Sequence, residues 1–201
     1  MKERGILFQA EMVRAILEGR KTQTRRALRI QPLDILPMNI HNEWATLQTR
    51  DHNHGNVIRC RFGVPGDRLW VREKWGVHRL DGIVIKEFPN VLYAADTSTR
   101  LVTTDKVWKY VEDKFRWRPS IFMPRWASRI TLEIVNIRVE RVGDISEADA
   151  IAEGIPPFLP SPSKIPIMQY ATLWNRINQK SDFGWDVNPY VWVIEFKRCP
   201  I

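Results

Sequence analysis

Apolar residues at the start of the chain follow first the period of a strand and then that of a helix. Ile6–Phe8 forms a short apolar run that predicts a strand. Apolar residues at helical spacing within Gln9–Glu18 predict one amphipathic helix. Gly19 follows at the position where a glycine commonly ends a helix.

The clearest strand pattern covers Arg129–Val142. Ile130, Leu132 and Ile134 share one face, and from Val135 onward the apolar residues occupy the other face. A shift of one residue within a continuous strand indicates a bulge or a sharp bend. Small, strongly curved β-barrels contain such features.

A second alternating stretch, Arg68–Trp75, places Leu69, Val71 and Glu73 on one face. A Gly-Pro-Gly-rich turn at 63–67 precedes it. Further short strands are predicted at Val57–Phe62, Ile83–Glu87, Val91–Ala95 and Tyr190–Phe196.

Two more helices are predicted in the C-terminal half. Ser146 begins a capping-box pattern, so a helix is expected over Glu147–Glu153, ending at Gly154. After a proline-rich loop, apolar residues at helical spacing between 167 and 177 predict an amphipathic helix.

The elements together predict an α+β protein, mostly β, with a few helices around its rim. The 201 residues fit a single domain better than two. Residues 30–56 and 96–120 interrupt the pattern, and we interpret both as insertions.

The composition indicates which kind of partner the chain prefers. A formal net charge of +8 favours a polyanionic partner such as nucleic acid. Nine tryptophans could stack on exposed bases, although core packing is the favoured explanation for most of them. Cys60 and Cys199 form no disulfide framework or metal pair, which fits a reducing cytoplasm. No apolar run predicts a signal peptide or a membrane span, so we expect a soluble cytoplasmic protein that does not enter membranes.

Neither a metal nor a cofactor is predicted. His52 and His54 are the closest histidine pair, and no carboxylate or cysteine completes a familiar ligand spacing. Walker, dinucleotide-binding and Gly-x-Ser-x-Gly patterns are also missing from the sequence.

The segment Gly19–Arg26 carries the candidate chemistry. It places Lys21 and the Thr24 hydroxyl three residues apart among arginines. Such a cluster can bind a phosphate, and it can also lower the pKa of a lysine until the amine acts as a base. A solvated basic edge is the structural alternative.

The pattern Gly19-x-Lys21-x-x-x-Arg25, the later turn Gly66-Asp67 and the final strand with Val193–Phe196 resemble an ASCH domain. The resemblance implies a PUA-like small β-barrel with flanking helices and loop insertions, as in larger prophage-type members. It also implies RNA or a modified nucleoside as the partner.

One branch of that family hydrolyses the acetamide of N4-acetylcytidine with a Lys, a Thr and a Glu. Its Lys-Thr-x-Thr segment matches residues 21–24. The resemblance therefore implies Lys21 as proton acceptor and Thr24 as nucleophile. Glu153 is the best match for the glutamate, with Glu147 and Asp149 nearby.

The residue types suit this reaction. A threonine hydroxyl needs a neighbouring base, and a lysine serves only when its pKa is lowered. On a regular strand, however, Lys21 and Thr24 point to opposite faces. They can meet one ligand only if the chain turns just after Gly19.

Basic and aromatic residues elsewhere are candidates for contacts with nucleic acid or nucleoside. The candidate binding residues are Arg20, Arg25, Arg26, Arg72, Glu73, Trp75, Arg125, Trp126 and Ser128.

Two alternatives to the amidohydrolase remain open. One is a non-catalytic module for RNA or single-stranded nucleic acid, with Arg25, Arg72 and Trp126 as contacts. The other is a ribonuclease that uses Lys21 and its arginine neighbours. The sequence leaves the oligomeric state undetermined.

Overall fold

The computed structural model describes residues 1–31, 46–51, 54–77, 91–96, 116–156 and 165–200. Five strands form one mixed sheet in the order β1-β5-β8-β9-β2. Their bounds are β1 (Glu3–Leu7), β2 (Gln23–Ala27), β5 (Arg68–Arg72), β8 (Thr131–Arg141) and β9 (Tyr190–Arg198). Only β1 and β5 pair in parallel.

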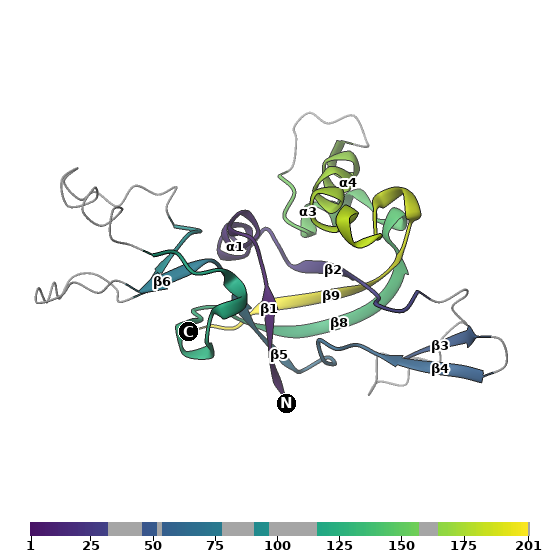
Figure 1. The fold of residues 1–201 in the computed structure, drawn as a ribbon, viewed down its shortest axis with the longest axis horizontal. Helices are drawn as coiled ribbons and strands as arrows, with labels where there is room; N and C mark the ends of the chain where they lie inside the picture. The colour runs from purple at the N-terminus through teal and green to yellow at the C-terminus, as the bar shows by residue number, and fades with distance from the viewer. Residues whose placement is uncertain (32–45, 52–53, 78–90, 97–115, 157–164, 201) are drawn as a thin grey trace, which may run out of the picture.

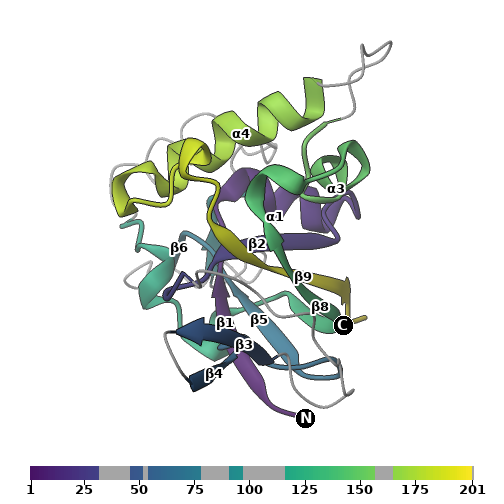
Figure 2. The same ribbon diagram turned by 90° about the vertical axis from the view of Figure 1, so that its right-hand side faces the viewer.

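In the described part of the chain three α-helices accompany the sheet, namely α1 (Ala10–Leu17), α3 (Glu147–Ala152) and α4 (Ile165–Asn178). Figures 1 and 2 show α3 and α4 together over the β2–β9 end of the sheet, with the hairpin β3–β4 on the other side. The mixture of helices and sheet confirms the α+β class. Among the described residues, no helix is long and apolar enough to cross a membrane.

The predicted closed barrel is wrong for the described part of the chain. In that part, β1 and β2 are the two outer strands of the sheet and no ladder joins them. A single side-chain contact connects their ends, from Arg26 Nη2 to the Leu7 carbonyl at 2.6 Å. The sheet is therefore curved but open between β1 and β2.

The predicted irregularity in the long strand is confirmed. The pairing of β8 with β9 passes from Ile134–Phe196 directly to Asn136–Glu195, so Val135 has no partner in β9. Val135 is half exposed, whereas Ile134 is buried. The change of apolar face in the sequence thus corresponds to a β-bulge.

The turn and capping signals are confirmed in the backbone. Gly19 and Gly154 have positive φ angles of 76° and 98°, which favour glycine. The Ser146 side chain accepts a hydrogen bond from the Asp149 amide at 3.1 Å and caps α3.

The strand predicted at Arg68–Trp75 needs correction. The stretch Arg68–Trp75 is not one strand, because β5 ends at Arg72 and β6 (Trp75–Val77) pairs instead with β7 (Val91–Tyr93). The predicted face of β5 is correct, since Leu69, Val71 and Glu73 are all buried.

The first insertion was predicted to be irregular, and that prediction is wrong for its second half. Residues 46–59 contain the antiparallel hairpin of β3 (Thr46–Asp51) and β4 (His54–Arg59). Their polar composition gives no alternating apolar pattern from which strands could be recognised. The strand predicted at Val57–Phe62 accordingly lies three residues earlier.

The predicted strand Ile83–Glu87 and most of the second insertion lie outside the described residues. At the end of that insertion, Arg118 forms a bridge with Trp75. Two short 3₁₀ turns follow, η1 (Ser120–Phe122) and η2 (Arg125–Ala127).

Two apolar cores flank the sheet near β2 and β9. The larger core joins α1 to one face, with Phe8, Val13 and Ile194 among its buried residues. The smaller one joins α3 and α4 to the other face and includes Tyr170 and Trp174. Strand β2 lies at the sheet edge between these two layers, and this position defines the candidate site.

Candidate functional site

The chain turns between α1 and β2. Such a turn is expected from the sequence just after Gly19, since Lys21 and Thr24 would otherwise point to opposite faces of a strand. The amides of Arg20 and Lys21 both donate to the Ala15 carbonyl, at 2.9 and 3.0 Å. The Thr22 amide then donates to the Ala152 carbonyl of α3 at 2.9 Å. Strand β2 begins only at Gln23, so Lys21 precedes the strand and the period of two does not govern its direction.

Within β2, alternate side chains enter different environments. Gln23 and Arg25 face α3 and contact Asp149, through a hydrogen bond of 2.9 Å and an ion pair of 3.3 Å. Thr24 and Arg26 belong to the opposite face. The Arg26 guanidinium lies over the ring of Phe8, with 5.3 Å to the ring centroid.

Lys21 and Glu153 form a buried ion pair at 2.6 Å. The Lys21 ammonium also donates to the main-chain carbonyls of Glu153 and Gln23, at 2.7 and 2.8 Å. Burial lowers the pKa of Lys21; the Glu153 carboxylate opposes this shift, and the charges of Arg26 and Arg25 add to it. Three acceptors around one nitrogen fit the ammonium, because a neutral amine has only two N–H donors.

Arg25 is held by three carboxylates. It forms ion pairs with Glu140, with Asp149 and, at 3.4 Å, with Glu153. Arg138 extends this network by contacting the first two carboxylates. Because these carboxylates already bind its guanidinium, Arg25 stabilises the fold and is a weaker candidate for ligand binding.

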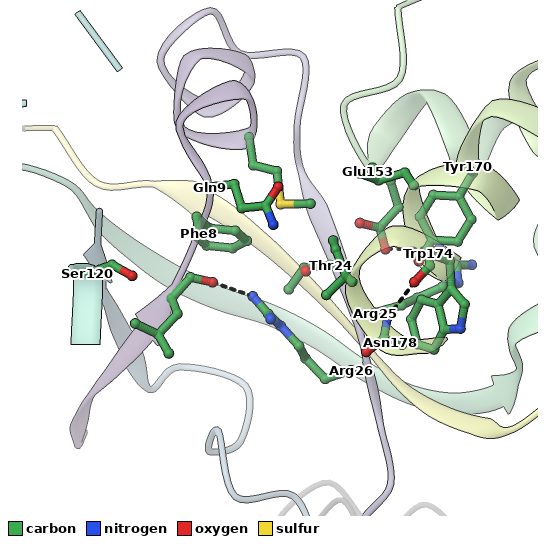
Figure 3. A pocket seen from close by; sticks show the side chains of 14 residues that line it. Phe8, Gln9, Thr24, Arg25, Arg26, Ser120, Glu153, Tyr170, Trp174 and Asn178 are labelled. Atoms are coloured by element: carbon green, nitrogen blue, oxygen red, sulfur yellow. Dashed lines mark hydrogen bonds and ion pairs between the residues drawn. The ribbon is translucent and has the colours of Figure 1, made fainter. Parts of the chain in front are cut away.

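A cavity of about 210 Å³ opens beside β2, where the sheet is not closed. Thr24 and Glu153 both line it. Figure 3 shows Thr24 between Phe8 and Arg26 on one side and Glu153, Tyr170 and Trp174 on the other. The full lining is Leu7, Phe8, Gln9, Met12, Thr24, Arg25, Arg26, Ser120, Glu153, Tyr170, Leu173, Trp174, Ile177 and Asn178.

Lys21 is not among the residues that line this cavity. Its side chain is fully buried beside Glu153. Its contact with the carbonyl of Gln23 places the ammonium next to the peptide that leads into Thr24. The structure thus brings Thr24 and Glu153 to one cavity and keeps Lys21 adjacent, beside Glu153.

Arg20 and Arg26 lie in different surroundings. Arg20 pairs with Glu18 and donates to the Gly154 carbonyl at 3.0 Å. It lines a second cavity of about 500 Å³ between α1 and α4, which shares Glu153 with the first. Arg26 lines the first cavity and is the less constrained of the two neighbouring arginines of β2.

The remaining predicted contacts do not belong to this cavity. Arg72 donates to the Ile121 carbonyl, and Ser128 donates to the Val71 carbonyl at 2.8 Å. Glu73 is buried and pairs with Arg129 at 3.0 Å. These three positions link loops to β5 and do not line the cavity beside β2.

The predicted tryptophans differ sharply. Trp75 is only 1% exposed and packs edge-on against Trp126, so its assignment as a stacking platform is wrong. Trp126 is 69% exposed on η2. Arg125 beside it pairs with Glu3 at 3.0 Å.

Sequence reasoning missed the aromatic wall of the cavity. Phe8, Tyr170 and Trp174 line it from the end of β1 and from α4. Tyr170 and Trp174 are four residues apart on one helix, which is the spacing of a shared face. That spacing identified an amphipathic helix but could not show that its face closes a ligand cavity.

Within the described ranges, no three histidine, cysteine, aspartate or glutamate side chains gather as a metal site would require. Comparisons of the chain with protein-family models, with curated proteins and with solved structures found no match.

Proposed function

We propose that the chain is an ASCH-type, PUA-like domain that binds an N-acylated nucleobase or nucleoside and hydrolyses its amide. The observation that carries the proposal is the meeting of Thr24 and Glu153 at one cavity, with Lys21 paired to Glu153 at 2.6 Å. These residues come from segments more than a hundred positions apart, yet they provide a hydroxyl, an acid and an amine.

The first step requires a base. Transfer of one proton from Lys21 to Glu153 along their hydrogen bond converts the ion pair into an amine and a carboxylic acid. Burial lowers the pKa of Lys21 and so favours release of this proton. The amine must then leave the Gln23 carbonyl and accept the proton of the Thr24 hydroxyl.

The bond changes follow from these protonation states. The Thr24 oxygen forms a bond to the amide carbon, and the carbonyl electrons move to the amide oxygen. Collapse of this intermediate breaks the C–N bond, and Glu153 protonates the leaving nitrogen. Water then attacks the acyl-threonine ester, which releases a carboxylic acid and restores the Thr24 hydroxyl.

The cavity suits a small planar ligand. Its volume of about 210 Å³ lies below the range of about 300–1,000 Å³ usual for drug-sized ligands. Phe8, Tyr170 and Trp174 provide aromatic walls against which a base or an acyl group can pack.

The direct test is deacylation of N4-acetylcytidine and related N-acylated nucleosides by the purified protein. We expect turnover in the wild type, and a loss of at least about a hundredfold in Lys21→Ala and in Glu153→Gln. Arg29→Gln is the matched control, because Arg29 is exposed on the same segment. Equal rates in the wild type and Lys21→Ala would contradict the proposal.

A second function has its own support. Phe122 and Trp126 are each 69% exposed on η1 and η2, and Ser120 of η1 lines the cavity. Exposed rings on a basic protein suit stacking on single-stranded RNA without catalysis. In that case RNA binding would weaken strongly with salt and with Trp126→Ala, and N4-acetylcytidine would remain intact. Shortening of the RNA over time, lost in Lys21→Ala, would indicate the ribonuclease instead.

A further inference from the structure

Arg26 is a cavity-lining cation whose hydrogen-bonding groups are mostly unused. Its Nη2 donates to the Leu7 carbonyl, and its Nε is buried with no hydrogen-bond partner. Across the described residues, no carboxylate forms an ion pair with it. Its neighbour Arg25, in contrast, has three such partners.

Such a guanidinium is energetically unfavourable without a ligand. Burial lowers the pKa of Arg26, the charges of Glu153 and Tyr170 act in the opposite direction, and the charge of Arg61 adds to the lowering. The side chain as a whole is half-buried, so the cost falls on the buried Nε–H without an acceptor, and an anion that accepts from Nε would remove that cost.

The surroundings define what kind of anion fits. Apolar side chains lie around the cavity, among them Leu7, Phe8, Leu173 and Trp174. A cation bordered by apolar groups matches a carboxylate that carries a short hydrocarbon chain. A phosphate or sulfate offers no apolar part to fill the same space.

Thr24 and Arg26 are two positions apart on one strand, so they share a face and lie about 7 Å apart. A carbonyl carbon attacked by the Thr24 oxygen can therefore direct its oxygen toward Arg26. Attack by Thr24 makes that oxygen an oxyanion, and the hydrolysis ends with a carboxylate at the same carbon. The oxyanion and the carboxylate are both negatively charged, so Arg26 can bind either.

We propose that Arg26 is the anion-binding residue of this cavity: it stabilises the oxyanion formed on the acyl carbon and then holds the short-chain carboxylate product. This inference rests on the proposed amide hydrolysis for the oxyanion, but carboxylate binding can be measured without turnover. The inference also places the acyl group of the substrate, and not its base, against the apolar side chains beside Arg26.

The test is calorimetric titration of the wild-type chain with acetate, butyrate and butylamine. We expect butyrate to bind more tightly than acetate and butylamine not to bind. In Arg26→Gln the butyrate affinity should fall at least about tenfold, whereas Arg29→Gln should match the wild type. Arg26→Lys keeps the charge without the planar fork and should lie between the two.

The outcomes separate the two proposals. Unchanged butyrate affinity in folded Arg26→Gln and Arg26→Lys would overturn the role of Arg26, as would absence of carboxylate binding in the wild type. Arg26-dependent butyrate binding without any N4-acetylcytidine turnover would support the anion site and refute the hydrolysis. Turnover that is equally fast in the wild type and Arg26→Gln would keep the hydrolysis and overturn the oxyanion role.

Discussion

The Lys21 ammonium and the Glu153 carboxylate lie 2.6 Å apart in the interior, although 132 positions separate them in the sequence. The ammonium also donates to the main-chain carbonyl of Glu153 at 2.7 Å, so one side chain binds both parts of the same residue. This contact fixes the end of α3 against the turn that precedes β2.

Removal of one partner of the pair should be strongly destabilising, because the other charge would remain buried without its main counter-ion. Lys21→Met would leave Glu153 with only the longer contact to Arg25, and we expect a loss of about 3 kcal/mol in the free energy of unfolding. The measurement is urea denaturation of the wild type, Lys21→Met, Glu153→Gln and the double variant.

The coupling free energy between Lys21 and Glu153, obtained from the two single variants and the double variant, decides whether the ion pair itself stabilises the fold. The double variant should lose less than the sum of the two single losses, by about 1–3 kcal/mol. If the losses of Lys21→Met and Glu153→Gln were simply additive, the ion pair would not stabilise the fold as described here.

Gly154, at the end of α3, should not tolerate a side chain. Its φ of 98° disfavours other residues, and an added Cβ would lie 3.0 Å from Ala15 Cβ and 3.3 Å from Lys21 Cβ. Gly66→Ala is the matched control, because its φ of 88° is similar and nothing lies within 4 Å. We expect Gly66→Ala to lose about 1 kcal/mol from backbone strain.

Gly154→Ala should lose about 1–2 kcal/mol more than this control, since close packing adds to the strain. Thermal and urea unfolding of the two variants measure the difference. Equal losses at Gly154 and Gly66 would show that the space beside Lys21 is not restricted.

Asp149 should link stability to acid pH. Burial alone would raise its pKa, but the hydrogen bond from Gln23 and the charge of Arg25 outweigh burial and lower it. A lowered folded pKa means that the contribution is complete above the unfolded value of about 3.9 and is lost as the pH falls through the folded value.

The wild type should therefore lose stability between about pH 5 and pH 2 more steeply than Asp149→Asn. Urea midpoints across this range measure the slope, and exposed Asp144→Asn is the control that should retain the wild-type slope. A slope that is unchanged in Asp149→Asn would refute the network around Arg25.

The sequence predicted local features better than distant contacts. The bulge at Val135 and the turns at Gly19 and Gly154 were readable because each depends on neighbouring residues alone. The burial of Trp75 was not readable in this way, because β5 ends at Arg72 and Trp75 begins β6, where it packs with Met123 and Ala127.

The site could be predicted only in part. The basic segment identified Thr24 and Lys21, but the different states of Arg25 and Arg26 depend on carboxylates that arrive from β8 and α3. The open edge of the sheet was equally unreadable, since strand order follows from long-range pairing and not from the pattern within a strand.

The most direct test of the central claim is detection of an acyl group on Thr24. Wild-type protein and Thr24→Val are mixed with N4-acetylcytidine, quenched rapidly in acid and examined by peptide mass spectrometry. We predict one acetyl group on the peptide that contains Thr24, present at early times in the wild type and absent from Thr24→Val. Deacylation that continues at the wild-type rate in Thr24→Val, or acetyl groups found only on other residues, would contradict the account.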